Sequence, residues 1–204
     1  MRIIITPDEV ATINKFCEAV TKKIDKRDFF ENKNKHRTTE KAHEDSFRAK
    51  CSELAVSKIL QNEGIHCDVD FNIYARGIGD AFDIVTDGAS VDVKASSPRA
   101  RNLMIEKAKI VSWKERKVAP NYLCMVSVEE VDGTTVCEYM FGISMKNFKD
   151  NAKLFKRGQQ IPMAPTILKA DNFIVSANVC EDVSKFINYM KERNNANKLN
   201  MILE

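Results

Sequence analysis

Apolar residues recur with a helical period in two long segments of the chain. Between Pro7 and Ile24 they return every three to four positions, and the acids that follow Pro7 are typical of a first helical turn. From Thr39 to about Asn62 a second segment keeps this period and is followed by Gly64, which suits the left-handed residue that ends many helices. The pattern predicts two amphipathic helices.

A charged segment, 25–45, joins these helices and overlaps the start of the second. It is poor in aliphatic residues and rich in Asn and Lys. This composition favours a loop or a mobile surface segment. The alternative is a DNA-contacting arm, because Lys and Arg side chains bind phosphates.

Two segments in the middle of the chain have the pattern of strands. In 66–74 apolar and polar residues alternate, which predicts a strand with one face in water. In 81–96 the dipeptide Asp87-Gly88 lies between runs rich in β-branched residues. A type I′ turn at these two residues, which requires positive φ at both, predicts a hairpin.

The rest of the chain predicts a mixture of helices and strands. Proline and glycine positions and the Asp132-Gly133 dipeptide separate the segments. They are a basic helix, 98–120, a second hairpin, 121–144, a helix, 144–158, a proline-rich loop, 161–167, a strand, 172–179, and a last helix, 181–193.

This order of elements favours an α/β fold with a mixed central β-sheet flanked by helices. The length suits one domain, 1–204. Within it we expect a helix plus charged loop, 1–37, and a C-terminal elaboration, 144–204, around the central elements.

Composition excludes several classes of protein. The net charge of +3 is too small to indicate a polyanion partner unless the basic residues cluster on one surface. No apolar run approaches the length of a membrane span, so we expect a soluble chain with no membrane partner. The six cysteines form no CxxC pair, which favours buried thiols in a reducing, cytoplasmic compartment over disulfides or a zinc site.

The first hairpin carries unusual charges. If Asp87 and Gly88 form the turn, Asp83 lies directly opposite Asp92, and Lys94 lies on the same face as Asp92. Val91 and Val93 then point toward the core. Two opposed carboxylates repel each other, but together they can bind one hard divalent cation. Asp80 and Asp87 compete for the role of first acid, but Asp87 is explained by the turn and Asp80 adjoins a glycine.

Glu53 is a second buried acid that the pattern singles out. Its side of the predicted helix carries Ala49, Val56 and Leu60, and apolar residues cover much of the rest. A carboxylate among such neighbours is either paired with a cation or bound to a metal.

The order Glu53, Asp83, then Asp92-Val93-Lys94, on helix, strand and strand, resembles the PD-(D/E)xK nuclease superfamily, which has the restriction-endonuclease-like fold. The resemblance covers roughly residues 47 to 130 and includes the sequences "SELAVSKILQNEG", "FDIV" and "VDVKAS". Phe82 stands where the motif name has Pro, a position that varies in such proteins.

The resemblance implies magnesium-dependent hydrolysis of a phosphodiester bond, with Mn²⁺ as a substitute for Mg²⁺. Asp83, Asp92 and the Val93 carbonyl would bind the metal, and Glu53 would bind a second ion or hold a water. Lys94 would orient or deprotonate the attacking water and offset charge on the phosphate.

Candidates for nucleic-acid contact follow the Lys94 strand. Ser96 shares the face of Asp92 and Lys94, and 99–117 is the most basic helical segment. A solvated helix face explains these charges as well as phosphate contact does. The candidates are Ser96, Arg99, Arg101, Lys107 and Lys109.

The preferred function is an endonuclease that acts on DNA. A Type II-like restriction endonuclease ranks first because a long segment follows the core strands, ahead of a Holliday-junction resolvase or a phage or mobile-element nuclease. A non-catalytic nucleic-acid-binding module is the alternative of another class, and an RNA-directed enzyme stays open. Cutting both strands of a palindrome would favour a homodimer.

Overall fold

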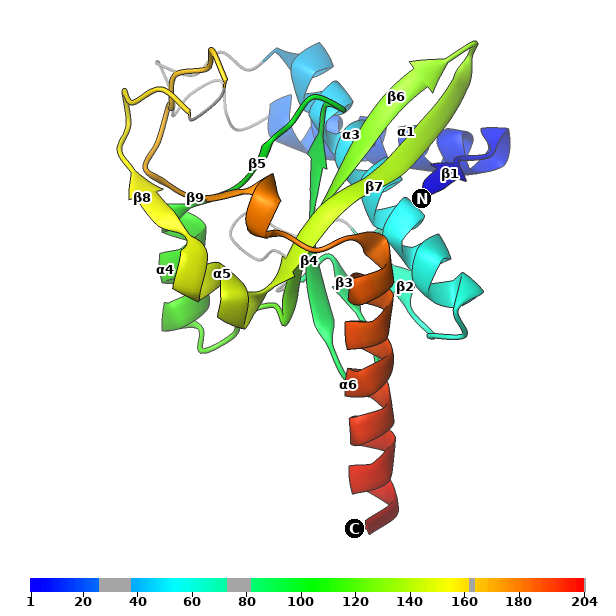
Figure 1. The fold of residues 1–204 in the computed structure, drawn as a ribbon. Helices are drawn as coiled ribbons and strands as arrows, with labels where there is room; N and C mark the ends of the chain where they lie inside the picture. Colours follow the sequence, from blue (N-terminus) through cyan, green and yellow to red (C-terminus); the bar gives the residue numbers. More distant parts are fainter. Residues whose placement is uncertain (26–37, 73–81, 162–163, 204) are drawn as a thin grey trace.

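The computed structural model describes residues 1–25, 38–72, 82–161 and 164–203, and within these ranges the side chains of 23–25 and 198–203 are not described (Figure 1). Most of the predicted charged arm, Ile73 and Asp80 therefore lie outside the described residues. The helices are α1 (Pro7–Asp25), α3 (Thr39–Asn62), α4 (Lys107–Glu115), α5 (Met145–Asn151) and α6 (Val183–Leu203), with a 3₁₀ turn, η1 (Ala177–Val179).

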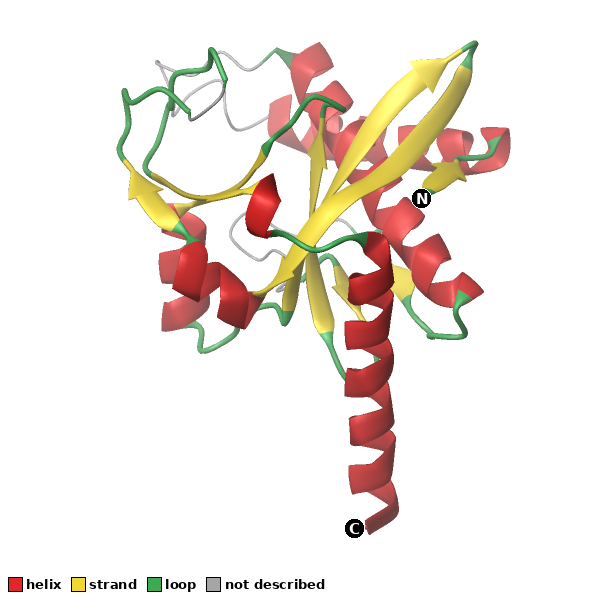
Figure 2. Ribbon diagram, viewed as in Figure 1, coloured by secondary structure: helices red, strands yellow, loops and turns green. Residues whose placement is uncertain are grey.

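The strands form a mixed sheet and a smaller antiparallel sheet beside it (Figure 2). Among the described residues, the large sheet has six strands in the order β1-β7-β6-β4-β3-β2, and β5-β9-β8 form the small one. Of the strand pairs that the structure describes in the large sheet, β4–β6 is parallel and the others are antiparallel. The strands are β1 (Arg2–Ile4), β2 (Asp68–Val69), β3 (Ile84–Val85), β4 (Ser90–Ser96), β5 (Asn102–Glu106), β6 (Tyr122–Val131), β7 (Thr134–Ser144), β8 (Lys153–Phe155) and β9 (Asn172–Ser176).

This architecture confirms the predicted α/β class with a mixed central sheet flanked by helices. Both predicted early helices are confirmed, and α3 begins with Thr38 as its cap and is followed by Gly64 at φ +74°. The second hairpin is also confirmed. Its turn residues Asp132 and Gly133 have φ of 50° and 72°, the values that a type I′ turn requires.

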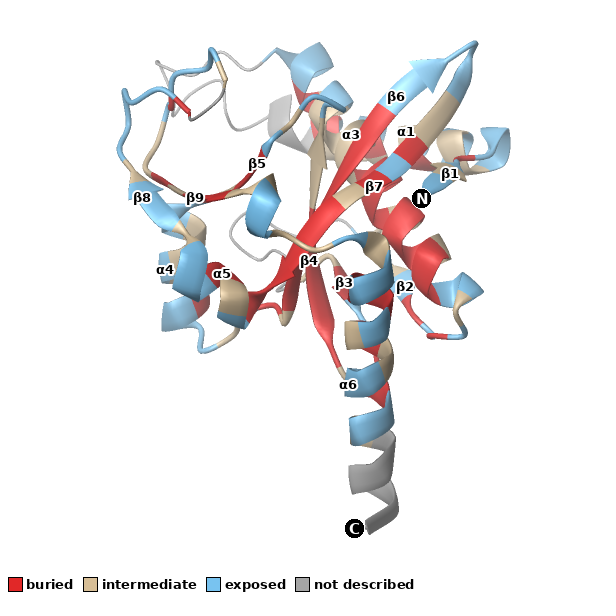
Figure 3. Ribbon diagram, viewed as in Figure 1, coloured by how far each residue is buried: buried red, intermediate tan, exposed pale blue. Residues whose placement is uncertain are grey.

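The two faces of the large sheet pack against separate cores. Figure 3 shows that much of its central strands is buried. On one face, Val91 and Val93 of β4 join apolar side chains of α1, α3 and α6. On the other face, Leu123 and Met125 of β6 join side chains of β5, α4 and α5. The middle strands are therefore covered on both sides, and Asp92 of β4, which faces the second core, is removed from water, whereas Lys94 and Ser96 on the same face are partly exposed.

The prediction of one helix over 98–120 is wrong in its first half. Residues Asn102–Glu106 form strand β5, which pairs antiparallel with β9. The reason is the alternation of Leu103 and Ile105, both almost fully buried in the second core. The basic helix that remains, α4, is only nine residues long.

The predicted strand over 66–74 is also much shorter in its described part. Only Asp68–Val69 form β2, which pairs with the equally short β3. The Asp70 carboxylate accepts a hydrogen bond from the Asn72 amide at 2.7 Å. This local bond turns the backbone and ends the strand.

Three further differences concern the ends of the chain. The predicted helix 144–158 ends at Asn151, because Lys153–Phe155 form β8 against β9. Strand β1 was not predicted, and it adds an edge to the sheet by pairing with β7. Helix α6 continues to Leu203, beyond the predicted 193. No described helix has the length and apolar character needed to span a bilayer.

Candidate active site

The hairpin of β3 and β4 has the predicted register. Ile84 pairs with Val91 and Val85 with Ser90, so the next residue outward on each strand is Asp83 or Asp92. Because Val91 and Val93 point into the first core, Asp92 and Lys94 lie on the opposite face, which is that of the second core. The sequence pattern therefore placed the two aspartates opposite each other correctly.

The predicted type I′ turn is wrong, although the register is right. Neither Asp87 nor Gly88 is among the described residues with positive φ. The Thr86 hydroxyl closes the bend instead, because it accepts a hydrogen bond from the Ala89 amide at 3.1 Å. The Thr86 amide also donates to the Ala89 carbonyl at 2.8 Å. The bend is therefore closed by the Thr86 hydroxyl and not by positive φ angles at Asp87 and Gly88.

Gly88 is needed here for space. A Cβ atom at this position would overlap the backbone of Arg193 and Asn194 in α6. The Gly88 amide donates to Asn194 Oδ1 at 2.8 Å, and Asn197 donates to the Asp87 carbonyl at 2.6 Å. Helix α6 therefore packs directly on the bend that sets the register of the two aspartates.

Asp92 is the most enclosed charged group of the site. Its side chain is 0% exposed and lies between two ammonium groups. Lys94 Nζ is 2.5 Å from Asp92 Oδ2. Lys109 Nζ, from α4, forms an ion pair and hydrogen bond with Asp92 Oδ1. A buried carboxylate requires such partners, so the two lysines explain how the acid is tolerated there.

Asp83 is held by the strand opposite it. Asp83 Oδ2 accepts a hydrogen bond from the Val93 main-chain amide at 2.6 Å. Burial and then the negative charge of Asp92 raise the pKa of Asp83, and they outweigh the lysines that lower it. The two carboxylates are therefore close enough to repel each other, as expected for opposed positions on paired strands.

The two aspartates stabilise the protonated form of Lys94. Burial lowers the pKa of Lys94, but attraction to Asp92 and Asp83 together raises it above the ordinary lysine value. A raised pKa suits an ammonium that stabilises negative charge or orients a water by donating to it. It is unfavourable for a lysine that removes a proton from water.

The donors of this site fit a hard divalent cation. Asp92 Oδ2 is buried and accepts no hydrogen bond of good geometry within the described part of the chain, despite the nearby ammonium. Asp83, Asp92 and the Val93 carbonyl all supply oxygen, the ligand that Mg²⁺ and Mn²⁺ accept. The fit rests on this pair and carbonyl, because no three His, Cys, Asp or Glu side chains converge in the described ranges.

Glu53 has a cation partner of its own. Its Oε2 lies 2.6 Å from Lys50 Nζ, and both side chains are almost fully buried. Lys50 also donates to the Asp70 carbonyl at 2.6 Å and lies over the rings of Phe16 and Phe71. Of the two explanations that the sequence offered, the structure shows the ion pair. The metal role of Glu53 stays a prediction, and α3 packs on the sheet face opposite Asp92.

The nucleic-acid candidates occupy different surroundings. The Ser96 carbonyl accepts a hydrogen bond from Arg48 at 2.6 Å, which brings a guanidinium to the end of β4. Arg99 and Arg101 are exposed in the connection from β4 to β5. Lys107 lies 3.8 Å from Asp171 on the surface. Lys109 contacts Asp92, so the structure brings into the site a residue that the sequence had assigned to phosphate contact.

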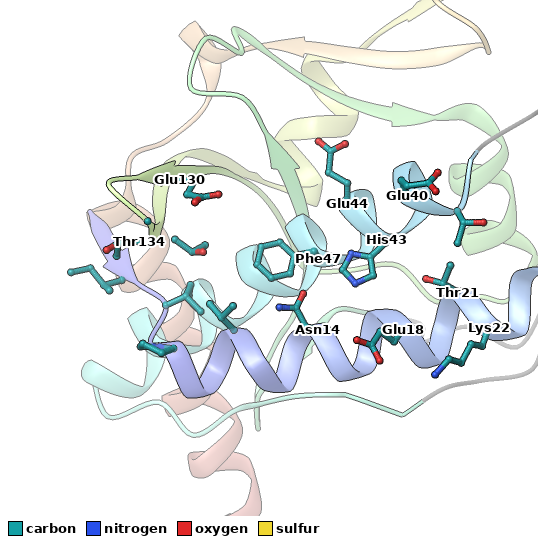
Figure 4. Close-up of a pocket in the computed structure, with 17 residues that line it drawn as sticks. Asn14, Glu18, Thr21, Lys22, Glu40, His43, Glu44, Phe47, Glu130 and Thr134 are labelled. Carbon is teal, nitrogen blue, oxygen red and sulfur yellow. The ribbon is translucent and has the colours of Figure 1, made fainter.

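One groove borders the site, and a larger cavity lies away from it. A groove of about 440 Å³ is lined by Asp83, Phe82, Asp68 and Asp70. A larger cavity of about 1230 Å³ lies between α1 and α3 (Figure 4). Its walls carry Glu18, Glu40, Glu44 and Glu130, and neither Asp83 nor Asp92 reaches it. The smaller groove is the one that borders Asp83, so it is the one relevant to a divalent ion at this site.

Comparison with known proteins adds no relative. No family model matches the chain, and no curated protein is significantly similar to it. The arrangement of Asp83, Asp92, Lys94 and Lys109 is therefore the basis on which a function is argued.

Proposed function

We propose that this protein is a magnesium-dependent endodeoxyribonuclease of the PD-(D/E)xK type. The observation that carries the proposal is the opposition of Asp83 and Asp92 across one hairpin, with Lys94 Nζ 2.5 Å from the Asp92 carboxylate. Two acids and an ammonium on one strand pair are the groups that this hydrolysis requires.

Asp83, Asp92 and the Val93 carbonyl would hold the ion, with Mn²⁺ as a substitute. When bound, the ion lowers the pKa of a water and withdraws charge from the scissile phosphate. The chain itself orients these ligands, because the Val93 amide fixes Asp83 and the core fixes Val91 and Val93. Lys94, held as an ammonium, donates to the attacking water or to the phosphate oxygen that gains charge.

DNA is the proposed substrate, and the basic groups around the end of β4 support it. Arg48 reaches the Ser96 carbonyl, and Arg99 and Arg101 are exposed just beyond it. These side chains would contact the phosphates on either side of the cut. A Type II-like restriction role, a homodimer and a cytoplasmic location complete the proposal. The cytoplasmic location is consistent with six free cysteines, five of them buried.

The test is cleavage of supercoiled, linear and branched DNA with and without Mg²⁺. We expect nicked or linear products from the wild type only with the metal. Lys94→Ala and Asp92→Asn should lose cleavage by at least a hundredfold, the size typical of a general acid–base or electrostatic group. Lys185→Ala, at an exposed position on α6, is the control and should cut normally.

Two results would contradict the proposal. Retarded bands without nicks on all three substrates would indicate a binding module of the same fold. Cleavage by Lys94→Ala at the rate of the control would remove the ammonium from the mechanism. Parallel reactions on RNA decide between the two nucleic acids.

A further inference from the structure

Lys109 occupies an oxygen that the proposed metal site needs. Its ammonium binds Asp92 Oδ1, whereas Lys94 faces Oδ2. Lys94 belongs to the same strand as Asp92, but Lys109 comes from α4, which is a separate element. The Asp92 carboxylate thus contacts two ammonium groups, Lys94 from its own strand and Lys109 from helix α4.

The charges of the site already balance without a metal. Two carboxylates, Asp83 and Asp92, face two ammonium groups, Lys94 and Lys109. A divalent ion added to this group would leave a large positive excess around the fully buried Asp92. Such an excess is unfavourable in a medium of low polarity, so an ammonium must leave or an anion must enter.

Lys109 is the ammonium with a route outward. Its side chain is 39% exposed, against 27% for Lys94. Lys109 Nζ also lies 5.2 Å from the centre of the Trp113 ring, one helical turn along α4. If the Lys109 ammonium leaves Asp92, its long side chain can turn toward solvent. The Trp113 ring can still attract the ammonium there, so it stays close to the site.

We infer that Lys109 is a resident counter-cation that the divalent ion displaces from Asp92. This inference rests on the proposed function, because it requires Asp92 to be a metal ligand. Lys109 then sets the affinity of the site for the ion, since each binding event must break its ion pair. The released ammonium stays beside the site, where it can attract a phosphate of the proposed substrate.

The test is calorimetric titration of the metal-free protein with MnCl₂ in the absence of DNA. Lys109→Met removes the competing ammonium, so we expect its dissociation constant for Mn²⁺ to fall about tenfold, which corresponds to about 1.4 kcal/mol. Lys109→Arg retains the charge and should bind Mn²⁺ about as the wild type does. Circular dichroism establishes that each variant is folded.

Lys114→Met is the matched control. Lys114 is exposed on the same helix, so this variant loses the same charge at a different place. A purely structural Lys109, which only holds Asp92 in position, predicts weaker Mn²⁺ binding in Lys109→Met. Binding that is weaker than in the control, or equal to it, would overturn the inference.

A separate variant distinguishes this failure from failure of the proposed function. Asp92→Asn should abolish Mn²⁺ binding if Asp92 is a ligand. Loss of binding in Asp92→Asn with no gain in Lys109→Met leaves the proposed function intact and refutes the role of Lys109. A wild type that binds no Mn²⁺, or an Asp92→Asn variant that binds it equally well, refutes both.

Discussion

The Asp83 carboxylate and the Val93 main-chain amide are joined by a 2.6 Å hydrogen bond across the first hairpin. The bond holds an acid on one strand against the backbone of the other, next to Asp92. It does so at a cost, because burial and the charge of Asp92 both raise the pKa of Asp83. Folding therefore disfavours the ionised form of Asp83 relative to the unfolded, metal-free chain.

Asp83→Asn should consequently stabilise the metal-free protein at neutral pH. The amide keeps an oxygen that accepts from Val93 but removes the buried negative charge. We expect the melting temperature in EDTA to rise by about 2–4 °C, the shift that corresponds to roughly 1 kcal/mol in a chain of this length. Thermal unfolding followed by circular dichroism measures the change, with the exposed turn variant Asp87→Asn as the control.

The pH dependence of that gain has a definite sign. A folded-state pKa above the unfolded one means that the protonated acid stabilises the fold and that this contribution disappears as pH rises through the folded pKa. The advantage of Asp83→Asn should therefore shrink as the pH falls through the raised pKa of Asp83, and it should be gone once the pH is below about 4, the ordinary carboxyl pKa. An advantage that grows in acid would show that Asp83 is stabilised as the anion.

Gly88→Ala should destabilise the protein through helix α6. The added methyl group overlaps the backbone of Arg193 and Asn194, and overpacking of this kind costs about 1–3 kcal/mol. Chemical denaturation measures the loss, and hydrogen exchange locates it at α6 and the first hairpin. Gly133→Ala strains a left-handed turn at φ +72° instead. Faster exchange in α6 should be absent from that variant, and its presence there would argue against the overlap.

The Lys50–Glu53 pair should behave as one unit. Removing a single member leaves the other buried charge without this partner, a loss that costs about 3–5 kcal/mol in buried pairs. We expect Lys50→Met and Glu53→Gln each to lose that much stability, and the double variant to lose clearly less than their sum. Urea unfolding of the four proteins gives the coupling. Additive losses would mean that the two side chains act independently.

The same Glu53→Gln variant tests the metal role expected from the sequence. If Glu53 only balances Lys50, the affinity for Mn²⁺ in calorimetric titration should equal that of the wild type. A loss of affinity would instead place Glu53 among the ligands.

The sequence predicted the site well where the chemistry is local. Opposition of Asp83 and Asp92 depends on the spacing across one bend, and alternation along β4 sets the face of Lys94. The turn type was wrong because the Asp-Gly pattern cannot reveal the Thr86 hydroxyl bond or the approach of Asn194 from a hundred residues away. Both contacts stabilise the register that a type I′ turn would have given.

Prediction failed where tertiary pairing decided the structure. The short strands β5 and β8 pair on either side of β9, and each adjoins a helix in the sequence, so neither was separated from that helix in the prediction. This error also concealed the role of Lys109. A single helix over 98–120 gave no reason to place its ammonium at Asp92, whereas a strand followed by a short helix brings it there.

The clamp between Gly88 and Asn194 has a consequence for biosynthesis. The two residues are 106 positions apart, so the bend that aligns the acids leaves the ribosome long before its partner helix exists. Such a distant contact forms late, because a long loop must close first. A nascent chain would then carry the paired aspartates in a hairpin that lacks this contact until α6 has been synthesised.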